Sequence, residues 1–167
     1  GSEMCIRDSG KVAYFADQAG NPTLGPVAFN GANIYMVNAM NGELIQMTKV
    51  AQNDNVNYPA GEHPALSNTD FTVLTGAMAL VGNTLITGVA GLAEANPNCQ
   101  PLTAGGCTLR GRVMAFNADT LEKKWERYTT PPVAGFTGAS VWQSTPAISR
   151  RLGLVFIGTG DNYTTPW

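Results

Sequence analysis

"IYMVNAMNGELIQMTKV", residues 34–50, and "RVMAFNADTLEKKWERY", residues 112–128, share one layout. Each has an apolar segment that ends in Asn-Ala, a short polar turn, and a second segment with a polar or charged start. Apolar runs separated by such turns predict β-hairpins. Residues 77–91 and 146–160 form a second matching pair, strand, turn and strand ending in Gly. The two kinds of hairpin alternate along the chain, which predicts four-stranded units laid end to end.

No amphipathic helix is predicted anywhere in the chain, so the fold class is all-β. Strands are predicted over residues 11–17, 32–39, 44–50, 76–82, 84–91, 112–118, 122–129, 141–149 and 154–160.

The repeated hairpins favour a fragment of a β-propeller, in which four-stranded blades surround a channel. The blade pieces are residues 10–50, 71–131 and 139–160, about two and a quarter blades of the four-stranded type. That number cannot close a ring, so apolar sheet faces would stay uncovered. We therefore expect the chain, made alone, to be poorly soluble or to associate.

Composition supports a β-protein and excludes some function classes. Of 167 residues, 44% are hydrophobic and 13% are charged, against roughly 25% charged in average globular domains. Glycine occurs 19 times and proline 10 times, which divides the chain into short segments. The formal net charge of -2 gives no basic surface for nucleic acid. No apolar run reaches the roughly 18 residues of a membrane span.

Two short regions stand apart from the blades. "GSEMCIRDSG" at the start has neither the basic start nor the apolar run of a secretory signal, and residues 1–9 are interpreted as a non-native junction before a domain at 10–167. Cys99 and Cys107 lie in a Gly-rich segment of a chain with a single histidine, His63, which leaves a zinc site short of ligands. A local disulfide, and with it an oxidising compartment, is expected; two reduced cysteines are the alternative.

"AFNADTLEKKW", residues 115–125, is similar to the tryptophan-docking repeat of quinoprotein propellers, A-x-D-x-x-T-G-x-x-x-W. Ala115, Thr120 and Trp125 match the repeat, whereas Asn117 replaces Asp and Leu121 replaces Gly. We interpret Trp125 as structural: a small residue leaves room for an indole from the neighbouring blade.

An earlier copy of the repeat, "MVNAMNGELIQ", is degenerate. It keeps Gly42 but has Met36 in the place of Ala and Gln46 in the place of Trp.

Residues 75–167 resemble the pyrroloquinoline quinone (PQQ) dependent alcohol dehydrogenases, in particular their polyvinyl-alcohol-dehydrogenase-like branch. The resemblance rests on the order of "VLTGAMALVGNTLITGVAG", "CTLRGRVMAFNADTLEKKWERYTTPP" and "GASVWQSTPAISRRLGLVFIGTGDNYTTPW". It implies an eight-bladed propeller in the periplasm or secreted, with PQQ and calcium as cofactors. It also implies oxidation of small secondary or polymeric alcohols by hydride transfer to PQQ, with a cytochrome c type electron acceptor.

The resemblance assigns four residues to the cofactor. Trp142 matches the tryptophan that forms a planar floor under the quinone. Ser140, two residues earlier and expected on the same strand face, matches a hydroxyl that binds a cofactor carboxylate, and Thr75 matches a threonine that lines the site. Arg110 matches an arginine near the cofactor. The alternatives are a core tryptophan, two ordinary strand hydroxyls and an arginine that only anchors its strand.

The resemblance also implies a calcium site built from oxygen ligands, which calcium prefers. Glu94 matches a glutamate ligand in a Gly-rich loop, and Asp161 stands where the family has an asparagine after Gly-Thr-Gly, with Asn162 next. Either Asp161 or Asn162 is the expected ligand. A solvated glutamate and an ordinary surface turn are the alternatives.

The family's catalytic aspartate, the base for the alcohol proton, belongs to a later blade beyond Trp167. We therefore expect no catalytic residue in this chain and no alcohol oxidation by it alone. Two other readings stay open: a cofactor-free quinoprotein-like propeller that acts as a protein-interaction scaffold, and a lectin-type propeller with unrelated binding.

Overall fold

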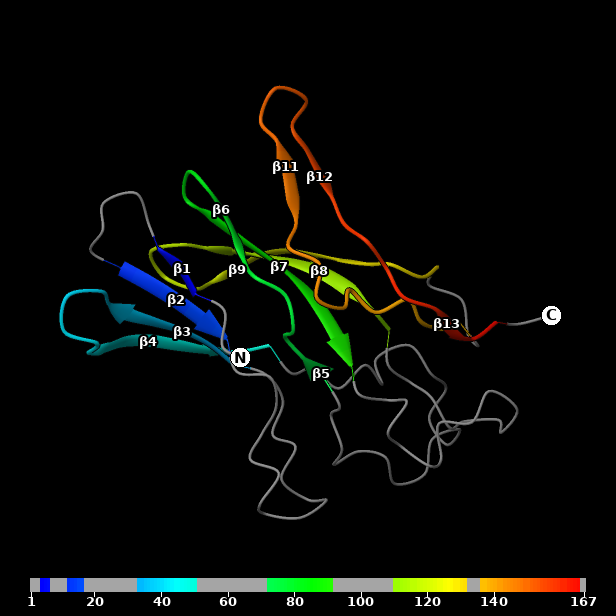
Figure 1. Cartoon of the computed structure of the whole chain (residues 1–167), viewed down its shortest axis with the longest axis horizontal. Coiled ribbons are helices and arrows are strands. Elements are labelled where there is room, and N and C mark those ends of the chain that lie inside the picture. Colours follow the sequence, from blue (N-terminus) through cyan, green and yellow to red (C-terminus); the bar gives the residue numbers. More distant parts are fainter. Residues whose placement is uncertain are drawn as a thin grey trace, which may run out of the picture.

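The structure, a computed structural model, describes residues 4–6, 12–16, 33–50, 72–91, 110–131 and 136–165. Every regular element in these ranges is a β-strand, which confirms the all-β prediction (Figure 1). The strands are β1 (Met4–Ile6), β2 (Val12–Ala16), β3 (Asn33–Asn38), β4 (Leu44–Lys49), β5 (Thr72–Val73), β6 (Ala79–Val81), β7 (Thr84–Gly91), β8 (Arg112–Asn117), β9 (Lys123–Tyr128), β10 (Thr137–Gly138), β11 (Ala147–Ser149), β12 (Leu154–Phe156) and β13 (Asn162–Thr164).

The strands form successive antiparallel sheets. The first sheet has the order β1-β2-β3-β4, and the second has the order β5-β7-β8-β9 with β6 also paired to β7. Strand β7 is therefore bordered on one side by two short strands, β5 at one end and β6 at the other. The last part of the chain pairs in the same way, since β10 pairs with β13 and β11 with β12.

Several boundaries differ from the sequence prediction. The strand expected over residues 141–149 is only Ala147–Ser149, because Gln143 has the left-handed conformation and interrupts strand geometry. The short strands β5, β10 and β13 were not predicted. Residues 4–6, set aside as part of a junction, form strand β1 along β2. They therefore contribute an edge strand to the first sheet.

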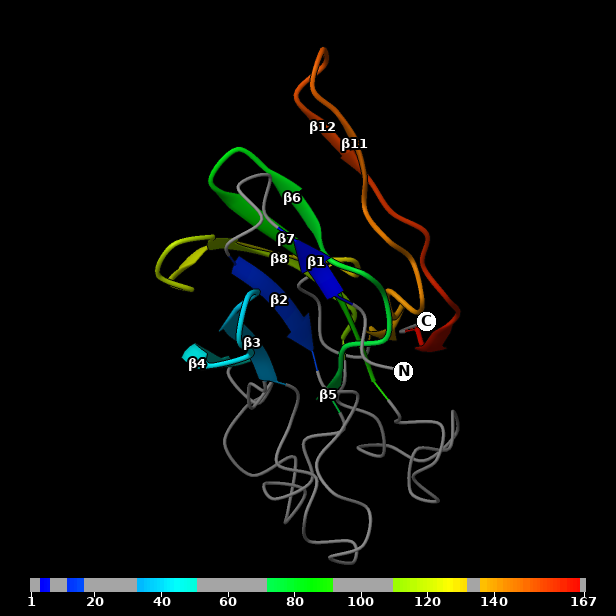
Figure 2. The same ribbon diagram turned by 60° about the vertical axis from the view of Figure 1, so that its left-hand side comes forward.

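The core consists of two apolar layers between the sheets. One layer joins Ile34 and Met36 of the first sheet to Met114 and Phe116 on β8. The other joins alternate β8 residues, Val113 and Ala115, to the hairpin β11–β12. Since neighbouring residues of a strand point to opposite faces, β8 is buried on both sides. Figure 2 shows the first sheet, the second sheet and the hairpin following one another.

An ion pair lies inside the first of these layers. Arg112 is fully buried on β8, with its Nε 3.0 Å from a carboxylate oxygen of Glu126 on β9. Its guanidinium also donates to the carbonyl of Val50, at the end of the first sheet. Arg112 therefore ties the two sheets together.

The docking repeat has its small residue and its indole in one sheet. Ala115 and Trp125 are Cα partners on β8 and β9, and Trp125 packs against the same apolar cluster as Ile148 and Val155 of the next hairpin. The structural role predicted for Trp125 agrees with this packing, but the expectation that the small residue makes room for an indole from the neighbouring blade is wrong. Cross-strand partners share a face, so alanine leaves its neighbour's indole free to reach the next sheet.

The degenerate copy of the repeat has the same cross-strand pairing, but its contact with the next sheet is polar. Met36 and Gln46 are Cα partners, and the Gln46 amide donates to the carbonyl of Thr120 in the second sheet. Both hairpins carry a register shift one residue further on, at Met36/Val37 and at Ala115/Phe116.

Two outer sheet faces remain apolar and exposed. Leu154 and Phe156, on the face of β12 opposite Val155, are 48% and 53% exposed. At the other end, Leu44 and Met47 on β4 are 55% and 51% exposed. These faces are consistent with the uncovered faces expected for a propeller fragment.

Candidate cofactor-binding site

The predicted site residues gather where the segment 138–144 crosses the second sheet. The Gly111 N–H donates to the carbonyl of Gly138, and Arg110 forms an isolated bridge with Gly138. Further along, the Val141 N–H donates to the carbonyl of Val89 on β7. The segment is therefore hydrogen-bonded to the second sheet at two places.

The same segment is bonded to residues 160 and 161, directly before strand β13. The Ala139 N–H donates to the carbonyl of Asp161 at 2.7 Å, and the Gly160 N–H donates to the carbonyl of Ser140 at 2.8 Å. These two bonds bring Asp161 beside the residues that precede Trp142.

Glycines allow this close approach. A Cβ on Gly111 would overlap the carbonyl of Ala139, and a Cβ on Gly88 would overlap the side chain of Val141. Real Cβ atoms do not tolerate such contacts, so both positions require glycine while the segment keeps its place. Backbone approach to another segment is one of the uses of glycine within a strand.

Trp142 and Ser140 do not share an environment. Trp142 is 40% exposed, whereas Ser140 is only 4% exposed. The expectation that both lie on one face of a strand is wrong, because residues 139–146 form a loop between β10 and β11. An exposed indole on a hydrogen-bonded loop can serve as a stacking surface.

Thr75 contacts this loop from the segment between β5 and β6. It is 7% exposed, and its hydroxyl oxygen accepts a hydrogen bond from the Gln143 N–H at 2.9 Å. A hydroxyl that accepts one bond still has its own proton to donate.

Arg110 is held by its own surroundings. Its Nε donates to the Thr130 hydroxyl at 2.8 Å, and Nη2 donates to the carbonyls of Thr130 and Pro131. The guanidinium also lies 4.0 Å from the ring centroid of Tyr128, a cation–π distance. These contacts join Arg110 to the residues that follow β9.

The expected metal ligands are placed in part. Asp161 and Asn162 are both exposed, and Asn162 is the Cα partner of Gly138. Glu94 lies outside the described residues, as do Cys99 and Cys107. Among the residues that the structure describes, no group of three or more His, Cys, Asp or Glu side chains could hold a metal ion.

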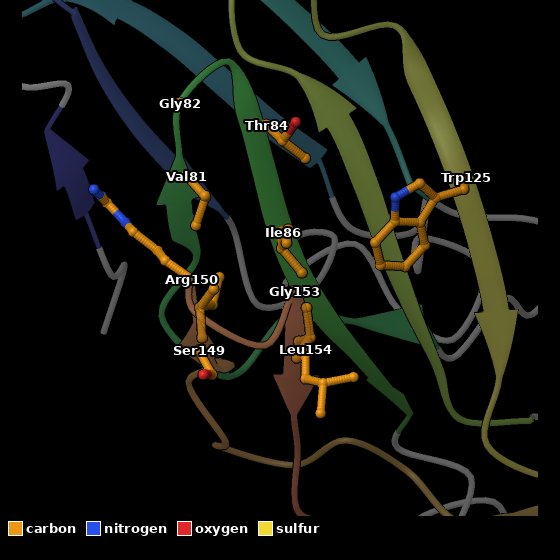
Figure 3. Close-up of a pocket in the computed structure, with 11 residues that line it drawn as sticks. Val81, Gly82, Thr84, Ile86, Trp125, Ser149, Arg150, Gly153 and Leu154 are labelled. Carbon is orange, nitrogen blue, oxygen red and sulfur yellow. The ribbon is translucent and has the colours of Figure 1, made fainter.

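A separate cavity of about 450 Å³ lies between the second sheet and the hairpin β11–β12. Figure 3 shows Trp125 and Ile86 of the sheet beside Leu154 of the hairpin, with Arg150 extending away from them. None of the predicted site residues lines this cavity. The cavity is therefore not the candidate cofactor site.

The residues that hold the loop of residues 139–146, the Trp142 loop, were not predicted from the sequence. Thr129 is one of them, since its hydroxyl lies 2.8 Å from the carbonyl of Gly111 and 2.7 Å from that of Ala139. Gly88 and Gly111 are others, and their glycine identity was the available signal. The contacts themselves join distant parts of the sequence, which no local pattern reveals.

In the part of the chain that the structure describes, no helix is long and apolar enough to cross a membrane.

Comparison with known proteins identifies the fold. No family model matches the sequence, and no curated protein matches it. Among solved structures, the quinohemoprotein alcohol dehydrogenase ADHIIG from Pseudomonas putida HK5 superposes with a TM-score of 0.56 at 18% identity. The quinohemoprotein alcohol dehydrogenase from Comamonas testosteroni gives 0.55 at 17% identity.

These similarities span nearly all of this chain and a small part of the others. The match to the Pseudomonas putida protein covers 91% of this chain and 20% of that one, and the match to the Comamonas testosteroni protein covers 92% and 20%. A europium-containing methanol dehydrogenase matches more weakly, with a TM-score of 0.43, 16% identity, and coverage of 75% and 14%. The chain therefore has the fold of a segment, about one fifth in length, of the quinohemoprotein alcohol dehydrogenases, in agreement with the resemblance drawn from its sequence.

Proposed function

We propose that this chain is part of an eight-bladed PQQ- and calcium-dependent alcohol dehydrogenase, and that the Trp142 loop forms part of its cofactor site. The observation that carries the proposal is the exposed indole of Trp142 on a loop bonded both to strand β7 and to residues 160 and 161. PQQ is a planar quinone, and an indole is the largest planar surface that a protein offers to it.

The neighbouring residues fit a polar, anionic cofactor. Thr75 keeps a hydroxyl proton, and Ser140 and Arg110 lie within the same hydrogen-bonded region. We propose that these three side chains line the site for the carboxylates of PQQ.

We further propose a calcium ion near the Gly-Thr-Gly turn, with Glu94 and either Asp161 or Asn162 as ligands. All three side chains supply the hard oxygen atoms that calcium prefers. Neighbouring residues of an extended strand point to opposite faces, so only one of Asp161 and Asn162 can face the indole.

When bound, PQQ supplies the hydride-accepting quinone, and the residues proposed here bind and orient it. The substrates in this proposal are small secondary or polymeric alcohols, the electron acceptor is a cytochrome c type protein, and the location is periplasmic or secreted. The proposed base is an aspartate of a later blade, so this chain by itself should not oxidise alcohols.

The test is a titration of the purified chain with PQQ in the presence of calcium, followed by calorimetry and by quenching of tryptophan fluorescence. We expect Trp142→Ala to abolish binding and Trp142→Phe to weaken it, while Trp125→Phe leaves the affinity unchanged. An affinity for PQQ in Trp142→Ala equal to that of the parent would refute the role of Trp142 as the stacking surface under the quinone. Absence of PQQ binding by the parent chain, with its fold intact, would refute the proposal that the residues of this chain hold PQQ by themselves.

The calcium site is tested with two variants, one at residue 161 and one at residue 162. Removal of the ligand side chain should reduce the calcium dependence of PQQ binding, so either Asp161→Ala or Asn162→Ala should do so and the other should not. Equal calcium dependence in the parent and both variants would exclude this turn as a ligand source.

A further inference from the structure

The peptide unit that follows Trp142 is bonded on both of its polar atoms. Its N–H, that of Gln143, donates to the Thr75 hydroxyl at 2.9 Å. Its oxygen, the carbonyl of Trp142, accepts from the Ser144 hydroxyl at 3.3 Å. The orientation of this peptide plane is therefore determined by two side chains.

The peptide unit between Ser140 and Val141 is bonded in the same way. Its oxygen accepts from the Gly160 N–H, and its N–H donates to the carbonyl of Val89. Val141 and Trp142 thus lie between two peptide units whose orientations are both constrained.

The backbone conformation of this loop is otherwise unfavourable. Ala139 has φ of 48° and Gln143 has φ of 50°. Residues with a Cβ cost roughly 1 to 2 kcal/mol in the left-handed region, so contacts must hold them there. The Thr75 bond acts on Gln143 itself, one of the two left-handed residues.

We propose that Thr75 is a positioning residue for Trp142: its hydroxyl holds Gln143 in the left-handed conformation and so sets the direction in which the indole leaves the loop. Gly76, the next residue, also contributes to this arrangement. A Cβ there would lie 2.8 Å from the Ser144 carbonyl oxygen, so glycine lets the Thr75 loop approach the Trp142 loop. The identity of the group that stacks on the indole rests on the proposed function, whereas the positioning role of Thr75 does not.

The positioning role is tested on the chain labelled with 5-fluorotryptophan, by fluorine NMR and by amide hydrogen exchange. The chain contains 3 tryptophans, and Trp142→Phe and Trp125→Phe assign their resonances. In Thr75→Val we expect exchange of the Gln143 amide to quicken by roughly 3- to 10-fold, the value of one net hydrogen bond. The Trp142 resonance should shift or broaden while the Trp125 resonance stays in place.

Two further variants separate positioning from general destabilisation. Thr75→Ser keeps the hydroxyl and should restore both signals. Thr87→Val removes another buried hydroxyl of the same sheet, one that donates only to the carbonyl of Gly88, and should change neither signal. Gly76→Ala should shift the Trp142 resonance as Thr75→Val does.

Two outcomes would overturn the proposal. One is a Trp142 resonance and a Gln143 exchange rate in Thr75→Val equal to those of the parent. The other is an equal effect of Thr87→Val. A PQQ titration of the same labelled samples separates the two hypotheses. If Thr75→Val moves the Trp142 resonance and PQQ does not, the positioning role stands and the cofactor site fails.

Discussion

Leu121 combines a buried side chain with a backbone conformation that favours glycine. It lies in the turn between β8 and β9 with φ of 55°, where the earlier hairpin has Gly42 with φ of 75°. Its side chain is 2% exposed and belongs to the apolar layer between the first and second sheets. The position therefore sets two energies of opposite sign against each other.

Replacement of Leu121 by alanine removes the buried side chain and keeps the left-handed Cβ, at a cost of about 3 to 5 kcal/mol. Glycine in its place removes one more carbon and adds backbone freedom to the unfolded chain, which together cost about 1 to 2 kcal/mol. It also relieves roughly 1 to 2 kcal/mol of left-handed strain. We therefore expect the free energies of unfolding of Leu121→Gly and Leu121→Ala to agree to within about 1 kcal/mol, because the two effects nearly cancel.

Leu85 is the matched control. It belongs to the same apolar layer and is fully buried, but it lies in strand β7. There Leu85→Gly should be less stable than Leu85→Ala by about 1 to 2 kcal/mol. The assay is equilibrium urea unfolding at low protein concentration. A glycine penalty at Leu121 as large as that at Leu85 would refute the strain argument.

Three further outcomes are expected. Trp125→Ala should lower the free energy of unfolding by about 3 kcal/mol in urea unfolding, because the half-buried indole packs against the apolar cluster that the hairpin also covers; equal stability would refute its docking role. Glu126→Ala leaves the charge of Arg112 buried without its carboxylate and should cost about 3 to 5 kcal/mol in the same assay; a loss below about 1 kcal/mol would show that this charge is compensated elsewhere. Leu154→Ser together with Phe156→Ser should weaken self-association in sedimentation velocity, since both side chains lie on an uncovered face; unchanged sedimentation would exclude this face as the contact.

The all-β class and the hairpins were predictable because they depend on local chemistry. Alternation of side chains along a strand has a period of two, and turn residues such as Asn117 act on their own neighbourhood. The Asn117 side chain accepts from the Asp119 N–H at 2.8 Å, so asparagine serves here where the family repeat has aspartate. The same bond in the earlier hairpin joins the Met40 N–H to Asn38.

The candidate site was predictable only as a set of residue types. Trp142 and Thr75 were identified through a family resemblance, but the bond that joins their loops spans 68 residues of sequence. Whether a hydroxyl is buried or an indole is exposed depends on which distant segment covers it. The sequence could not show that Arg110 is held by Thr130 and Tyr128.

The strands and turns of hairpins such as residues 112–128 were thus determined by the local sequence. The loop around Trp142 was decided by the packing of one sheet on the next. Close approach at Gly88 and Gly111 and left-handed backbone at Ala139 and Gln143 are stable only once those sheets are in contact. The physical reason is that strained backbone persists only where surrounding contacts determine it, and these contacts come from tertiary structure.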